Sequence, residues 1–165
     1  QAQAWATEFS RDHDPSRIHG ESNCFRYRAR PWTLVRCPGR HQERPPVDLL
    51  LALFACRRVG ATCEASLAND VPWRAALAEW AGITVTVESD AALAERLSGR
   101  RDGTLRLLGD AEPETLAAAR RANLSVLDGP AYANGRLELT RYLREQAISR
   151  TMHRYGNLQS DPERS

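Results

Sequence analysis

Lysine is absent from this 165-residue chain, and arginine supplies all 23 of its basic side chains. A Schiff-base or pyridoxal-phosphate enzyme needs a lysine amine, and so does the phosphate loop of P-loop NTPases. These classes are excluded for this segment. Methionine occurs once, at Met152, and no methionine opens the sequence. We therefore expect a piece of a longer chain or a processed protein.

Long apolar runs are also missing. No segment approaches the roughly 20 apolar residues that span a bilayer, and the N-terminus lacks the basic and then apolar pattern of a secretion signal. We expect a cytoplasmic protein with no membrane span. Acidic residues number 21 and the formal net charge is +2, with both signs alternating along the chain. Without a broad basic field, no nucleic-acid partner is expected.

Cysteine and histidine are few and scattered, with four of each and no C-x-x-C motif. A chain of this length buries enough surface to hold its fold without disulfides. We therefore expect reduced, structural thiols and no metal site. The cysteines are Cys24, Cys37, Cys56 and Cys63.

From residue 31 onward, short apolar runs alternate with longer helical stretches, and Gly, Pro or Asp separates them. This alternation is typical of βαβ units, whose parallel sheet is covered on both faces. We predict an α/β fold with a Rossmann-like, doubly wound, mostly parallel sheet of about five strands. The expected strands are 32–37, 61–67, 83–87, 105–108 and 124–127.

The expected helices carry start and stop signals. Val47–Val59 has so few polar residues that it must be covered on most sides. The next helix ends at Gly82 and has Leu77 and Trp80 on one face, and Ser89 caps the one after it. Acidic residues around Glu112 begin another helix, and 137–146 forms a last amphipathic one.

This pattern divides the chain into four parts. Residues 1–32 show no sustained periodicity after a short helical start and are expected to form a connecting arm. Residues 33–146 form the Rossmann-like domain, 147–158 a C-terminal pairing strand, and 159–165 a disordered tail.

The expected pairing strand alternates as a strand should, yet neither of its faces is apolar enough for a core. A segment of this kind suits edge pairing, in which main-chain hydrogen bonds provide affinity. We take its residues as candidate interface positions: Ile148, Arg150, Thr151, Met152, His153, Arg154, Tyr155, Gly156, Asn157 and Leu158.

Catalytic and cofactor motifs are weak. The turn after the first strand, Cys37-Pro38-Gly39-Arg40, is not the G-x-G-x-x-G of a dinucleotide site. Cys37 is the best thiol candidate, but a strand-end core residue is the favoured interpretation. Glu112 and Glu114 are better explained as a helix start than as acid–base groups. We therefore name no catalytic, cofactor-binding or metal residue.

Two stretches, 14–28 and 137–158, resemble the C-terminal region of the proline utilization A family. That family fuses proline dehydrogenase to L-glutamate gamma-semialdehyde dehydrogenase. Gly20-Glu21-Ser22-Asn23 is similar to the G-E-x-N that closes the aldehyde dehydrogenase catalytic unit, and the tail to Leu158 is similar to the family's terminal motif.

The resemblance implies a non-catalytic, aldehyde-dehydrogenase-like domain that covers the channel between two active sites. Its partner would be the dehydrogenase domain of the same chain or a second subunit. The family's catalytic cysteine segment, its E-L-G-G segment and its cofactor-binding lysine are all missing here. NAD, and FAD in a bifunctional parent, would bind elsewhere in the parent enzyme. The alternative from the residues alone is an independent α/β module that binds a nucleotide or anion.

Overall fold

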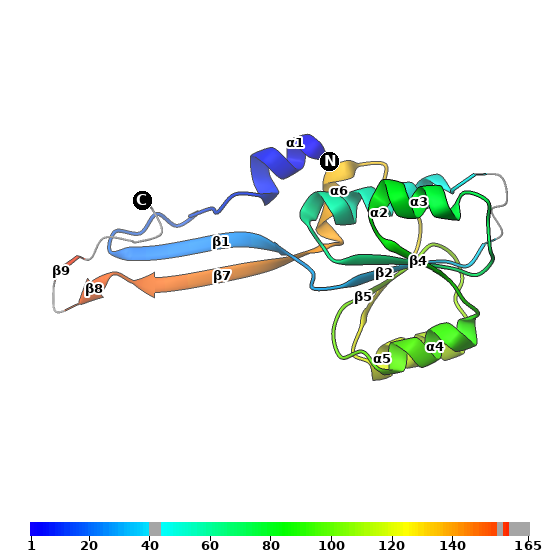
Figure 1. Ribbon diagram of the computed structural model, residues 1–165. Coiled ribbons are helices and arrows are strands. Elements are labelled where there is room, and N and C mark those ends of the chain that lie inside the picture. Colours follow the sequence, from blue (N-terminus) through cyan, green and yellow to red (C-terminus); the bar gives the residue numbers. More distant parts are fainter. Residues whose placement is uncertain (40–43, 155–156, 159–165) are drawn as a thin grey trace.

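The central feature is a five-stranded parallel sheet with the order β4-β3-β2-β5-β6. The computed structural model (Figure 1) describes residues 1–39, 44–154 and 157–158. The five strands and their parallel direction match the expected doubly wound fold. From β2 the chain adds β3 and β4 on one side of the sheet and then crosses to add β5 and β6 on the other. The strands are β2 (Thr33–Cys37), β3 (Cys63–Leu67), β4 (Thr84–Val87), β5 (Thr104–Leu107) and β6 (Ser125–Leu127).

Helices cover both faces of the sheet (Figure 1). One core joins the sheet to α2, α3 and α6, and a second core joins the opposite face to α4 and α5. Alternate strand residues supply the two cores, with Val35 in the first and Leu34 in the second. The helices are α2 (Val47–Val59), α3 (Arg74–Ala81), α4 (Asp90–Ser98), α5 (Pro113–Arg121) and α6 (Gly135–Thr140).

The helix boundaries follow the sequence signals closely. Gly60 and Gly82 end α2 and α3 in the left-handed conformation, with φ of 72° and 64°. The Ser89 side chain accepts a hydrogen bond from the Ala92 amide and so caps α4. One detail of α3 differs from the expectation: Leu77 is buried, but Trp80 is 45% exposed.

A two-stranded antiparallel ribbon projects from this α/β body (Figure 1). It is formed by β1 (Glu21–Ala29) and β7 (Leu143–Thr151), paired from Glu21 with Thr151 to Ala29 with Leu143. The expectation of a connecting arm over 1–32 missed β1. Its residues are mostly half-buried, because a ribbon of two strands has no second layer to complete its burial.

The helix expected over 137–146 is wrong in its second half. The short helix α6 ends at Thr140, and β7 begins at Leu143. Helical periodicity continues past Thr140, but pairing with β1 satisfies the backbone groups of residues 143–146 instead. The pairing strand therefore begins four residues earlier than the expected boundary at 147.

Two short helical turns precede the ribbon, in agreement with the expected helical start. Residues Ala2–Ala4 form α1, and Trp5–Phe9 form the π-helical segment η1. At the far end of the ribbon, β8 (His153–Arg154) pairs antiparallel with β9 (Asn157–Leu158). The expected disordered tail, 159–165, lies outside the described residues. In the part of the chain that the structure describes, no helix is long and apolar enough to cross a bilayer.

Candidate interaction site: the β1–β7 ribbon

The register of the ribbon sorts its side chains into two faces, because directly opposed residues point to the same side. One face, called here the arginine face, contains four arginines and no carboxylate of either strand. The other, called the aromatic face, contains Phe25 and Tyr27. The arginine face consists of Ser22, Cys24, Arg26, Arg28, Arg144, Gln146, Ile148 and Arg150.

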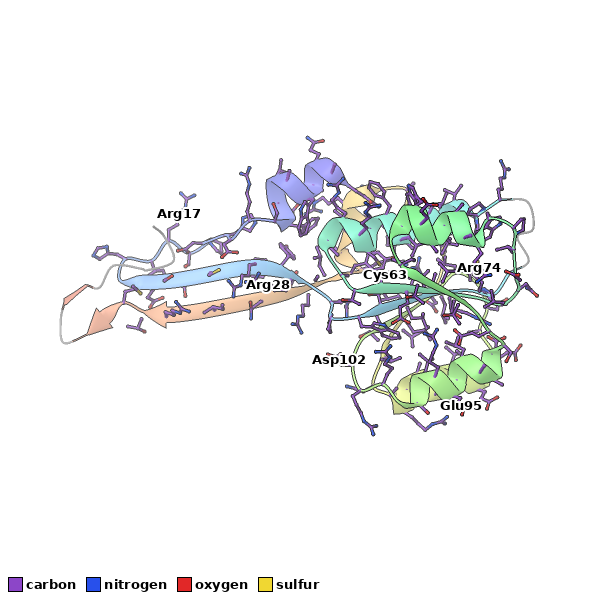
Figure 2. All side chains as sticks on the ribbon, in the orientation of Figure 1. Arg17, Arg28, Cys63, Arg74, Glu95 and Asp102 are labelled. Atoms are coloured by element: carbon purple, nitrogen blue, oxygen red, sulfur yellow. The ribbon has the colours of Figure 1, made fainter. Side chains whose placement is uncertain are left out.

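Two like charges stand directly opposite each other on the arginine face. Arg28 of β1 is the register partner of Arg144 of β7, and both side chains are exposed. Figure 2 shows Arg28 on the half of β1 nearest the α/β body. Arg26 differs, because its Nε donates to the Gln146 side chain at 2.8 Å and its Nη1 lies 3.7 Å from Asp12. Directly opposed like charges destabilise an antiparallel pair.

The N-terminal helical segment covers part of the aromatic face. The Phe9 and Tyr27 rings meet edge to face with centroids 4.8 Å apart, and Phe25 meets Tyr27 in the same way at 5.3 Å. Burial raises the pKa of the Tyr27 hydroxyl above its ordinary value. The part of this face around Tyr27 is therefore covered by the chain itself.

Glu8 and Arg136 hold the helical segment in place. The Arg136 guanidinium donates two hydrogen bonds of 2.7 Å to the Glu8 carboxylate, which joins η1 to α6. These hydrogen bonds lower the pKa of Glu8 below its ordinary value.

The outer edges of the ribbon are not equivalent. Beside β1, the Phe25 amide donates to the His13 carbonyl at 2.7 Å and its carbonyl accepts from the His13 amide at 2.8 Å. Phe25 thus directs its backbone groups away from β7. Its register partner Ala147 must do the same on the opposite side, as must Glu145 and Ser149. Among the described residues no strand pairs with this outer edge of β7.

A buried polar cluster fixes the root of the ribbon to the body. Glu138 is fully buried and accepts hydrogen bonds from the Tyr142 hydroxyl at 2.7 Å and the Tyr132 amide at 2.8 Å. Burial raises the pKa of Tyr142 strongly, so its hydroxyl stays a donor. The Arg30 amide donates to the Tyr142 carbonyl at 2.9 Å and continues the pairing into the body. These hydrogen bonds therefore fix the orientation of the ribbon relative to the α/β body.

The candidate residues from the sequence fall on three elements. Ile148, Arg150 and Thr151 lie in the outer half of β7, opposite Cys24, Ser22 and Glu21 of β1. The Met152 amide donates to the Gly20 carbonyl at 2.9 Å. His153 and Arg154 form β8, and Asn157 and Leu158 form β9. Tyr155 and Gly156 lie outside the described residues.

Sequence reasoning missed the inner half of β7 and the whole of β1. The signal was present in residues 24–28, where Phe25 and Tyr27 alternate with Cys24, Arg26 and Arg28. A period of two with one aromatic face indicates a half-buried strand.

A crevice lies at the carboxyl edge of the sheet, the edge at which a doubly wound fold would bind a nucleotide. It is lined by the segments that follow β5 and β6, and by Asp48 of α2. It has a volume of about 470 Å³ and contains Asp48, Asp110 and Asp128, with no basic side chain among the described residues that line it. A Cβ at Gly109 would lie 3.0 Å from the Pro38 ring, so the loops after β5 and β2 are packed closely together. Three carboxyl groups oppose the binding of a pyrophosphate.

The remaining candidates have structural explanations. Cys37 is 2% exposed, and burial raises the pKa of its thiol, which agrees with a strand-end core residue. Glu112 and Glu114 lie at the start of α5, as expected. All four cysteines are free thiols. Within the described residues, no group of three or more His, Cys, Asp or Glu side chains is arranged to hold a metal ion.

The chain was compared with protein-family models, curated proteins and solved structures. No family model and no curated protein matches it. A solved structure of another protein matches nearly all of it. That structure is proline utilization A. The enzyme is from Corynebacterium freiburgense, the match has a TM-score of 0.55 and 28% sequence identity, and it covers 94% of this chain.

The same match covers only 13% of proline utilization A, so this chain spans about an eighth of that protein's length. An alignment over 94% of this chain extends beyond the α/β body alone. The resemblance of residues 14–28 and 137–158 to proline utilization A therefore agrees with a relation over the whole fold.

Proposed function

We propose that this chain is the non-catalytic C-terminal domain of a proline-catabolic enzyme. The parent would oxidise L-glutamate gamma-semialdehyde to glutamate, with NAD accepting the hydride. The domain would cover the substrate channel and contact the dehydrogenase domain of the same chain or of a second subunit. NAD, and FAD in a bifunctional parent, would bind outside this segment.

The observation that carries the proposal is the projecting ribbon with its open β7 edge, in a chain similar to proline utilization A over 94% of its length. A ribbon of two strands is marginal by itself in water. This one is nine residue pairs long and is anchored at its root by the buried Glu138. Such a ribbon gains most of its stability when a partner covers it, which supports a docking role.

The crevice at the carboxyl edge of the sheet supports the non-catalytic part of the proposal. The three aspartates of the crevice repel the phosphates of a dinucleotide. The turn after β2 lacks the glycines that let a backbone approach a pyrophosphate. The same features weigh against the alternative of a module that binds a nucleotide or anion. No specific observation favours that alternative.

A deletion in the full-length parent tests the proposal. Removing residues 147–165 takes away the outer half of β7 and the segments beyond it. We expect proline-dependent NADH production to fall, or the semialdehyde to escape to solvent, where an added aromatic amine traps it. Reduction of the flavin by proline should stay unchanged, because that half-reaction does not use the channel.

The matched control removes only residues 159–165 and keeps β7, β8 and β9. It should behave as the intact enzyme does. Unchanged coupled NADH production after the longer deletion, without trapped semialdehyde, would contradict the proposal.

A further inference from the structure

We propose that the outer edge of β7 binds an acidic β-strand of a partner polypeptide, and that Arg28 and Arg144 together bind a carboxylate of that strand. This inference rests on the proposed function, because it specifies the chemistry of the partner that the ribbon docks against. The occupant is a protein segment in the extended conformation.

The backbone of β7 provides the first part of the argument. Glu145, Ala147 and Ser149 direct their amides and carbonyls away from β1, and the structure shows no partner for this edge among the described residues. The side chains at these positions are exposed. An exposed edge of this length is a template for another strand, unless charge or a covering segment protects it. On the β1 side, by contrast, the His13 segment already occupies the edge.

The charge of the arginine face provides the second part. Arg28 and Arg144 oppose each other directly, and neither guanidinium group makes a hydrogen bond or ion pair with any described residue. The nearest acidic neighbour in the sequence, Glu145, belongs to the aromatic face, and Asp12 reaches Arg26. A carboxylate from outside the chain can accept from both guanidinium groups, which converts a repulsive pair into a bridged one. A strand beside β7 places alternate side chains on this face.

The order of residues along β7 predicts the pattern of the partner strand. On the arginine face the sequence runs Arg144, Gln146, Ile148, at every second position. The partner should therefore carry an acidic residue opposite Arg144 and an apolar residue opposite Ile148, four positions apart, with a polar residue between them. A second copy of this ribbon does not fit, because two arginine faces side by side would repel each other.

Peptide binding to the whole 165-residue chain tests the inference. The probe is a fluorescent peptide with the sequence Thr-Glu-Thr-Gln-Thr-Val-Thr-Glu-Thr, followed by fluorescence anisotropy. We expect saturable binding that weakens as salt is raised. The same peptide with Gln in place of both Glu residues should bind at least tenfold more weakly.

Charge reversal at one arginine provides the decisive variant. Arg144→Glu should weaken binding of the acidic peptide at least tenfold. The same change should raise the Tm of the free chain by about 1–3 °C, because it replaces repulsion from Arg28 with attraction. If Arg144 had only a structural role, its substitution would not weaken peptide binding and raise the Tm at the same time. Arg28→Gln is the milder second variant, and it should weaken binding without lowering Tm.

The matched control is Arg101→Glu, an equal change of charge at an exposed arginine in the loop between α4 and β5. Binding should stay within twofold of the unmodified chain. Equal binding of the Glu and Gln peptides, equal weakening by Arg101→Glu, or no binding of the Glu peptide would overturn the inference. Tighter binding of a short DNA duplex than of the peptide would also overturn it, in favour of a phosphate-binding surface.

These outcomes can be separated from those of the proposed function. If the chain binds the acidic peptide but the deletion of 147–165 leaves coupled NADH production unchanged, the channel role fails and the acidic-strand site stands. If the deletion acts as expected but no peptide binds, the ribbon docks by other chemistry.

Discussion

Two arginines of the central strands, Arg36 and Arg106, are at most 1% exposed, although they differ in how their charge is satisfied. Arg36 donates to the Ser66 hydroxyl at 2.8 Å, to the Glu88 carbonyl at 3.0 Å and to the Asp90 carboxylate at 2.9 Å, and only its Nε has no partner among the described residues. Nη1 of Arg106 donates only to backbone carbonyls, and its Nε and Nη2 have no partner among the described residues.

Because the two arginines differ in their hydrogen-bond partners, we expect the same substitution to change the free energy of unfolding by different amounts. Arg36→Met removes the cation from a carboxylate and two further acceptors, and should lower the free energy of unfolding by about 3 kcal/mol. Arg106→Met also removes two unsatisfied buried nitrogens, so its loss should stay within about 1 kcal/mol. Urea denaturation of both variants provides the measurement. Equal losses, or a larger loss at Arg106, would contradict this account.

At the scale of elements, the two edges of β7 differ. One edge pairs with β1, and no described strand pairs with the other. In antiparallel pairing, residues alternate between those that bond across the pair and those that point outward. Because Phe25 points outward to His13, the residues of β7 that bond to β1 are Arg144, Gln146, Ile148 and Arg150.

Hydrogen exchange measured by NMR should show this alternation along β7. The amides of Gln146 and Ile148 should be protected, whereas those of Glu145 and Ala147 should exchange like the amides of an open loop. A saturating acidic peptide should slow exchange at Glu145 and Ala147 and leave Gln146 and Ile148 nearly unchanged. Uniform protection along β7 in the free chain would show that its outer edge is already paired.

At the scale of the whole molecule, the α/β body has the sheet order of a nucleotide-binding fold but an acidic crevice at its carboxyl edge. A fold does not by itself establish a function, because the function depends on the residues of the binding or catalytic site. In the proposed function, the body is the base from which the ribbon projects, and it binds no nucleotide.

Calorimetric titration of the chain with NAD should therefore show no binding tighter than about 1 mM. The reason is the repulsion between the phosphates and the aspartates of the crevice, together with the missing glycines of the turn. ADP-ribose, which lacks the nicotinamide ring, should give the same result. Saturable binding of either molecule at micromolar concentration would favour the nucleotide-binding alternative.

The body was predictable from the sequence because its signals are local. Gly82 ends one helix and Ser89 begins the next, and both act through the backbone within a few residues. The five strands follow from apolar runs between these signals. The buried arginines were not predictable, because Arg36 and Arg106 are charged residues within otherwise apolar runs and their partners lie on other elements.

The ribbon was only partly predictable. The alternation from Ile148 to Tyr155 indicated a strand that pairs with a dehydrogenase domain or a second subunit. The partner that the structure shows for residues 148–151 is β1 of this chain. This partner lies more than a hundred residues earlier, and no local signal in either strand specifies that contact. The helical period of 137–146 also competes with the strand until tertiary pairing decides between them.

The separation of the two ribbon strands has a consequence during synthesis. Ala29 leaves the ribosome more than a hundred residues before its partner Leu143. At typical elongation rates, β1 and its exposed rings Phe25 and Tyr27 wait roughly 6–23 s for β7. Arg26 and Arg28 interrupt this apolar stretch on both sides of Tyr27, and charges placed in this way suppress strand-to-strand aggregation. Arg28, one of the two arginines of the proposed docking surface, thus also protects the nascent chain.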